Sequence, residues 1–89
     1  MINQKVTIIN KLGLHARAAA KLVAVTSRYG CSIEIGNQNK MVDAKSIMSV
    51  MLLAASKGTE LAIRVDGENE QQALQDILDL VNNFFDEGE

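Results

Sequence analysis

Apolar and polar positions alternate along three short segments of this chain, which predicts three β-strands that each bury one face. The first strand is expected from about Gln4 to Ile9, and the last ends before the turn at Asp66 and Gly67. Residues 36–39 have turn composition, so residues 40–43 are expected to pair back on the second strand as a hairpin. The alternating apolar residues are Val6 and Ile8, then Cys31, Ile33 and Ile35, then Leu61, Ile63 and Val65.

Three other segments have the period of an amphipathic helix. The first is expected from Ala16 to Tyr29, with Gly30 as the residue that follows the C-cap. The second is expected over residues 46–56, ending before Gly58, and the third from Asn69, paired with Gln72 as a cap, to about residue 84. The predicted buried faces are Ala19, Leu22, Val23 and Thr26 on the first helix and Leu74, Ile77, Val81 and Phe84 on the last.

The predicted order of elements is therefore β-α-β-β-α-β-α, in one domain spanning residues 1–89. Helices gathered on one face of a mixed or antiparallel sheet make a two-layer α+β fold. The acidic end, residues 86–89, is expected to fray.

Composition excludes several classes of function. A net charge of -2 and three aromatic residues without tryptophan argue against a dedicated nucleic-acid binder. A single cysteine, Cys31, allows no internal disulfide and is expected to be a small core residue, and one cysteine with one histidine makes a zinc site improbable. No apolar run reaches the length of a membrane span, and no phosphate-binding glycine loop is present. The first residues do not have the layout of a signal peptide, so we expect none. We therefore expect a cytoplasmic protein without a cofactor or metal.

The only histidine, His15, stands where the first helix should begin, and Arg17 follows two residues later. Free backbone N–H groups and the positive end of the helix dipole favour an anion there. A neutral imidazole has one ring nitrogen with an available lone pair, so the pattern suits a phosphoryl group carried on nitrogen. The spacing alone leaves open an ordinary solvated surface histidine. A hydrolase with His15 as general base is disfavoured, because no nucleophilic set is completed by the sequence.

The segment from Gly13 to Ala19, GLHARAA, resembles the active-site signature of the HPr family of histidine-containing phosphocarrier proteins in the bacterial phosphotransferase system. Length, element order, the segment 44–48 and the segment 57–59 extend the resemblance over the whole chain. It implies an open-faced β-sandwich with three helices over a four-stranded antiparallel sheet. It also implies a monomeric carrier rather than a stand-alone catalyst, with His15 accepting a phosphoryl group on Nδ1 from enzyme I and passing it to enzyme IIA. Arg17 and the backbone of residues 16–18 (Ala16, Arg17 and Ala18) would hold the phosphoryl group.

Two positions depart from the family's common pattern. Ala18 stands where the family usually has proline, which restores one backbone N–H donor at the helix start, and Leu12 has no polar group to cap the site. Together with the lead-in of residues 10–13, Ala18 keeps open a nitrogen-related regulatory branch, in which the same relay does not move sugar.

Ser46 precedes an apolar helical segment and is expected to be its N-cap. The resemblance adds a regulatory role, because relatives are phosphorylated at this serine by an ATP-dependent kinase. Apolar residues in the first turns of a helix are typical of a core, but the resemblance implies instead an exposed docking patch beside His15. That patch would consist of Ile47, Met48 and Met51, ringed by the basic residues Arg17, Lys21 and Arg28. An alternative function is a regulatory binding module that acts through Ser46 and this patch.

Overall fold

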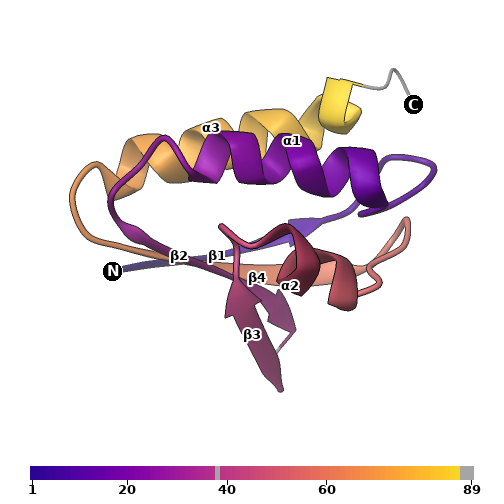
Figure 1. The fold of residues 1–89 in the computed structure, drawn as a ribbon, viewed down its shortest axis with the longest axis horizontal. Helices are drawn as coiled ribbons and strands as arrows, with labels where there is room; N and C mark the ends of the chain where they lie inside the picture. Colours follow the sequence, from indigo (N-terminus) through magenta and orange to yellow (C-terminus); the bar gives the residue numbers. More distant parts are fainter. Residues whose placement is uncertain (38, 87–89) are drawn as a thin grey trace.

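The computed structural model describes residues 1–37 and 39–86. Four antiparallel strands form one sheet in the order β1-β4-β2-β3. Helices α1 and α3 lie side by side over one face of the sheet, while α2 packs against α1 and strand β3 (Figure 1). The elements are β1 (Ile2–Thr7), α1 (Ala16–Thr26), β2 (Ser32–Asn37), β3 (Lys40–Asp43), α2 (Ile47–Leu52), β4 (Glu60–Asp66), α3 (Glu70–Asn82) and a 3₁₀ turn, η1 (Phe84–Asp86). This arrangement confirms the predicted two-layer α+β fold.

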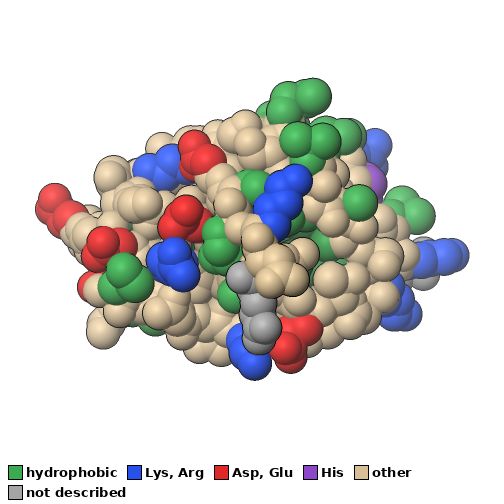
Figure 2. Space-filling model, turned by 90° about the horizontal axis from the view of Figure 1, so that it is seen from below, with side chains coloured by type: hydrophobic (Ala, Val, Ile, Leu, Met, Phe, Trp, Pro, Cys, Tyr) green, Lys and Arg blue, Asp and Glu red, His purple; other side chains and the backbone are tan. Residues whose placement is uncertain are grey.

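The alternation of apolar residues places one side of every long strand in the core. Val6 of β1 lies opposite Leu61 of β4, and Ile35 of β2 lies opposite Ile63 of β4. These side chains are buried beneath the helices, where Leu22 of α1 is among the largest fully buried residues. The opposite face of the sheet is open and carries charged side chains of both signs (Figure 2). Cross-strand ion pairs form on that face, Lys5 with Glu60 at 3.8 Å and Arg64 with Glu34 at 3.4 Å.

Helix α1 ends at Thr26, so the prediction that it continues to Tyr29 was wrong. The Thr26 hydroxyl donates to the Ala44 carbonyl at 2.8 Å, which ties this helix end to the segment before α2. The chain then leaves through two tight turns, in which Arg28 N–H bonds Val25 and Tyr29 N–H bonds Thr26, both at 3.2 Å. Gly30 has no positive φ, so it is not a left-handed C-terminal cap as predicted.

The boundaries of α2 and β1 also differ from the predicted ones. Helix α2 ends at Leu52, four residues early, because Ala54 adopts a left-handed backbone with φ of 49°. Strand β1 begins at Ile2 and ends at Thr7. The tip of the predicted turn includes Gln38, which lies outside the described residues, but the flanking pair of Asn37 and Lys40 is in register.

Helix α3 begins without the predicted side-chain cap. Asn69 has a left-handed backbone and makes no capping bond, while Gln72 donates instead to Asp76 at 2.9 Å. At the other end the turn η1 has positive φ values, so Phe85 is fully buried and Phe84 only half-buried, the reverse of the predicted face. Residues 87–89 of the predicted frayed end lie outside the described residues.

Candidate functional site

His15 is the N-cap of α1 and is half-buried. Its backbone is extended, with φ of -73° and ψ of 178°, and its carbonyl accepts the N–H of Ala19 at 2.9 Å. The ring nitrogen Nδ1 accepts the backbone N–H of Arg17 at 3.3 Å. The lone pair of Nδ1 therefore faces the first turn of the helix, where unpaired N–H groups and the helix dipole favour negative charge.

The segment before His15 is hydrogen-bonded to the residues that follow α2 and packs closely against them. Leu14 is buried, and its N–H donates to the Ala55 carbonyl at 2.8 Å. Gly13 has φ of 67°, and a Cβ on it would lie 2.3 Å from the same carbonyl oxygen. Only glycine satisfies both conditions, so this close approach sets where the chain delivers His15.

The residues after His15 divide between solvent and core. Ala16 and Arg17 are exposed, whereas Ala18 is fully buried. The Arg17 side chain therefore reaches solvent at the helix start, and the backbone N–H of the same residue donates to Nδ1 of His15. Alanine at position 18 keeps its N–H in the first turn, where a proline would have none.

Helix α2 presents an apolar patch that includes the three predicted residues. The exposed fractions are 40% for Ile47, 70% for Met48 and 38% for Met51, and Leu52 extends the patch at 68%. The exposed position implied by the resemblance is confirmed, and the core position favoured by the residues alone is wrong. Figure 2 shows hydrophobic side chains gathered on the side of the molecule where the single histidine also reaches the surface.

Ser46 is the N-cap of α2, as predicted. Its hydroxyl oxygen accepts the N–H of Ser49 at 3.3 Å. The turn before it is closed by Asp43, whose carboxylate accepts the N–H of Lys45 at 2.9 Å and whose carbonyl accepts the N–H of Ser46 at 3.2 Å. Ser46 is half-buried, so its hydroxyl lies at the edge of the exposed patch.

Two of the predicted docking cations lie away from this patch. Lys21 extends toward the C-terminal turn, and its Nζ donates to the Phe85 carbonyl at 2.8 Å. Arg28 follows the far end of α1, thirteen residues after His15, a separation of roughly 20 Å at 1.5 Å per residue. It lines a hollow with the α3 carboxylates Asp76 and Asp79. Lys21 and Arg28 therefore do not complete a basic ring around His15.

A family model described as "PTS HPr component phosphorylation site" matches residues 2–83. The chain belongs to the HPr family of the phosphotransferase system. The phosphocarrier protein HPr of Pseudomonas aeruginosa is 58% identical over 86 residues, which cover 96% of each chain. The HPr of Cupriavidus necator is 46% identical over the full length of both chains.

Solved HPr structures share the fold over nearly the whole chain. A crystal structure of HPr from Thermoanaerobacter tengcongensis has a TM-score of 0.93 and 38% identity, and covers 98% of each chain. A crystal structure of Crh from Bacillus subtilis has a TM-score of 0.75 and 40% identity, and covers 94% of this chain and 97% of that one. That Crh structure is described as a dimer with a swapped domain. A monomeric state therefore stays a prediction for this chain.

Asn10 shapes the turn before His15. The sequence pattern indicates this residue only as part of the lead-in of residues 10–13. Its side chain is fully buried, and its Nδ2 donates to the Gly13 carbonyl at 2.8 Å. An asparagine three residues before a glycine, in a segment between a strand and a helix, is a signal for a side-chain-closed turn. That signal was present in the sequence, but it says nothing about burial.

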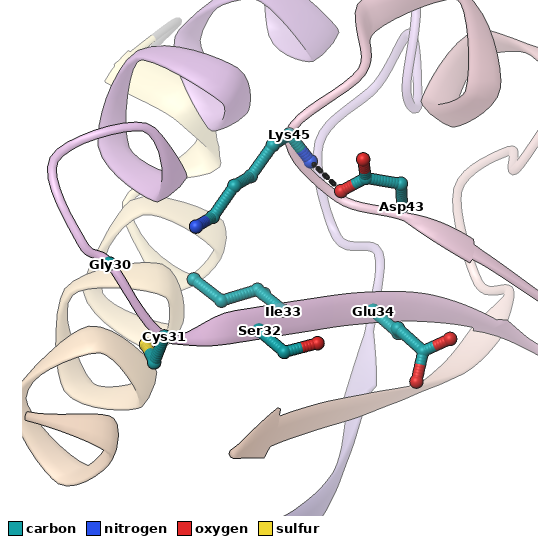
Figure 3. A pocket seen from close by; sticks show the side chains of 7 residues that line it. All are labelled: Gly30, Cys31, Ser32, Ile33, Glu34, Asp43 and Lys45. Carbon is teal, nitrogen blue, oxygen red and sulfur yellow. Dashed lines mark hydrogen bonds between the residues drawn. The ribbon is translucent and has the colours of Figure 1, made fainter. Parts of the chain in front are cut away.

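A surface hollow of about 390 Å³ lies away from His15, at the start of β2 (Figure 3). It is lined by Gly30, Cys31, Ser32, Ile33, Glu34, Asp43 and Lys45, none of which is a predicted phosphoryl or docking residue. Cys31 is buried, as expected. Among residues 1–37 and 39–86, no cluster of three histidine, cysteine or carboxylate side chains could hold a metal ion, and no helix there is long and apolar enough to cross a membrane.

Proposed function

We propose that this chain accepts a phosphoryl group from enzyme I on Nδ1 of His15 and passes it to an enzyme IIA protein. The observation that carries the proposal is the contact between Nδ1 and the Arg17 N–H. An N–H that donates to Nδ1 requires a lone pair on that atom, so the ring proton resides on Nε2. Nδ1 is thus the nucleophilic nitrogen, and it is held at a helix N-terminus.

The transfer step needs no cofactor from this chain. The Arg17 N–H releases the Nδ1 lone pair, which attacks phosphorus in line, and the bond from phosphorus to the donor atom of enzyme I breaks, with its electron pair remaining on the donor. The new P–N bond places negative oxygens beside the first turn of α1, where the N–H groups of residues 16–18 and the Arg17 guanidinium stabilise them. Transfer to enzyme IIA repeats the step with this P–N bond as the one that breaks. The exposed setting of the site suits contact with two proteins in turn.

Ile47, Met48 and Met51 form the proposed docking surface for both partners. Their exposed apolar area on the same side as His15 would be covered in the complex, and flexible methionine side chains adapt to different partner surfaces. Arg17 adds positive charge next to this surface, which favours acidic partners. Lys21 and Arg28 are farther away and would contribute to the long-range field rather than to direct contacts.

The proposal is tested by intact-mass analysis of the chain after incubation with phosphoenolpyruvate, magnesium and enzyme I. We expect one added phosphoryl group that is lost in mild acid, and none in His15→Ala. Ser46→Ala is the matched control, since it removes the other proposed phosphorylation site and should still accept the acid-labile group. No transfer to the wild-type chain by an active enzyme I from the same organism would leave the binding module as the better explanation.

The enzyme IIA acceptor distinguishes the two branches of the family. The phosphorylated chain is mixed with an enzyme IIA of sugar transport and, separately, with a nitrogen-related one. Faster loss of the phosphoryl group to the first supports a role in sugar uptake, and faster loss to the second supports the regulatory branch.

Ser46 is proposed as a regulatory phosphorylation site for an ATP-dependent kinase. A phosphate there would add about -1.5 to -2 charges at the edge of the docking patch and oppose an acidic partner. Incubation with ATP and candidate kinases should give an acid-stable mass increase that Ser46→Ala abolishes. The Ser46-phosphorylated chain should then accept the phosphoryl group from enzyme I more slowly. An unchanged rate would contradict the regulatory role.

A further inference from the structure

The turn that precedes His15 contains one of two fully buried polar side chains in the described part of the chain, Asn10 and Thr26. Burial of an amide is unfavourable unless its polar atoms are hydrogen-bonded. The Asn10 Nδ2 donates to the Gly13 carbonyl at 2.8 Å, and the Gly13 N–H donates to the Asn10 carbonyl at 3.2 Å. Residues 10–13 are therefore joined twice, once by main chain and once by the buried side chain.

The doubly joined turn fixes the start of the segment that carries the phosphoryl acceptor. Gly13 rests against the Ala55 carbonyl, Leu14 donates to that same oxygen, and His15 comes next as the N-cap. Only Leu14 separates Gly13, whose carbonyl is held by Asn10, from His15, whose Nδ1 is held by the Arg17 N–H. A rotation of the Gly13 peptide would move Leu14 and His15 together, because no flexible segment lies between them.

We propose that Asn10 is a positioning residue for phosphotransfer. By holding the Gly13 carbonyl, it keeps the His15 ring in the orientation in which Nδ1 receives the Arg17 N–H. Asn10 is buried behind the turn and does not touch the phosphoryl group. The inference rests on the proposed function for its effect on rate, but its effect on the ring is a property of the unphosphorylated chain.

The first test is the tautomer of the His15 ring, read from ¹⁵N chemical shifts and long-range ¹H–¹⁵N couplings at a pH where the ring is neutral. Wild type should show the proton on Nε2. Asn10→Leu, which replaces the amide by an apolar group of similar size, should show a mixture of both tautomers. This measurement needs no enzyme I, so it separates failure of the positioning role from failure of the carrier function.

The second test is the first-order rate of phosphotransfer at saturating phosphorylated enzyme I. Misplacement of a reacting group by about 1 Å can cost up to about a hundredfold in rate, so Asn10→Leu should be slower by about ten- to a hundredfold. Binding of enzyme I should change little, because Asn10 is not exposed.

Thr26→Val is the matched control. Thr26 is equally buried, and its hydroxyl donates to a backbone carbonyl at the same 2.8 Å, but at the opposite end of α1. It should lower stability by a similar amount and leave the tautomer and the saturated rate within about twofold of wild type. If Asn10→Leu does not fold, Asn10→Ala takes its place. A wild-type tautomer and rate in a folded Asn10 variant, or equal slowing in both variants, would overturn the proposal.

Discussion

A position can require glycine because its φ is positive or because no space is left for a Cβ. Four glycines of this chain differ in these two features, so replacing them by alanine should cost different free energies of unfolding. Gly13 has a positive φ of 67° and a backbone oxygen where its Cβ would lie, at 2.3 Å. Gly58 has a positive φ of 92° and open space where a Cβ would lie. Gly36 has no positive φ, but a Cβ on it would lie 1.9 Å from the Lys40 carbonyl oxygen. Gly30 has neither restriction.

The magnitudes follow from these two features. Gly30→Ala should be neutral or stabilising by up to about 1 kcal/mol, because alanine restricts the unfolded chain. Gly58→Ala should cost about 1–2 kcal/mol through the left-handed backbone alone. Gly36→Ala should cost about 1–3 kcal/mol through the displacement of strand β3. Gly13→Ala combines both effects, so we expect about 2–5 kcal/mol, within the total stability of an ordinary small domain.

Urea unfolding gives the four free energies, and phosphotransfer from enzyme I separates stability from function. Gly13→Ala must move residues 13–15 away from Ala55, so we expect at least a tenfold slower transfer in the folded variant, by the argument that misplacing a reacting group slows reaction. Gly36→Ala should transfer at the wild-type rate despite a comparable loss of stability. If Gly13→Ala costs no more than Gly58→Ala and transfers normally, the close approach to Ala55 does not position His15.

Three further predictions concern the chain ends, the strained turn and the patch. The N-terminal ammonium of Met1 donates to Oε1 of Glu70 at 3.4 Å, and this hydrogen bond raises the pKa of the ammonium above the ordinary value of 8.0. Because this pKa is raised in the folded state, the interaction contributes stability below pH 8 that is lost as the pH rises through the raised value. The free energy of unfolding should therefore fall in that pH window, and it should fall less in Glu70→Gln. Ala54→Gly should stabilise the chain by about 0.5–1 kcal/mol in thermal unfolding, whereas Ala20→Gly, in the middle of α1, should destabilise it by a similar amount. Met48→Ser should change stability by less than about 0.5 kcal/mol and yet weaken enzyme I binding about tenfold in calorimetry, because Met48 is 70% exposed.

The sequence predicts the elements of this fold better than their ends. Alternating apolar residues such as Ile33 and Ile35 determine which strand face is buried, and that depends only on local pattern. The end of α1 depends on the Thr26 hydroxyl reaching Ala44, a contact between segments 18 residues apart. Likewise, nothing in the local pattern indicates that Phe85 rather than Phe84 is buried, since a left-handed turn sets that choice.

In the candidate site, too, the sequence predicts the features that depend on local chemistry and not those that depend on distances in the fold. The position of His15 at a helix start and the N-cap at Ser46 follow from local chemistry, and the structure places both as predicted. The resemblance implied a basic ring of Arg17, Lys21 and Arg28. Helical spacing gives the face of a helix that such residues share but not their distance along its axis. Arg28 therefore shares a face with Arg17 in the pattern and still lies near the opposite end of the helix.

The segment after α2 links the chemistry of this site to its recognition surface. The Ala55 carbonyl accepts the Leu14 N–H and lies against Gly13, while α2, three residues earlier, carries Met48 and the rest of the exposed patch. A partner that docks on the patch thereby meets Nδ1 at a distance set by one short piece of backbone. Substitutions within the patch should then alter binding alone, and substitutions in the turn before His15 should alter the saturated rate alone. A carrier that must react with two different proteins benefits from this separation, because each partner can evolve its own contacts to the patch without disturbing the acceptor.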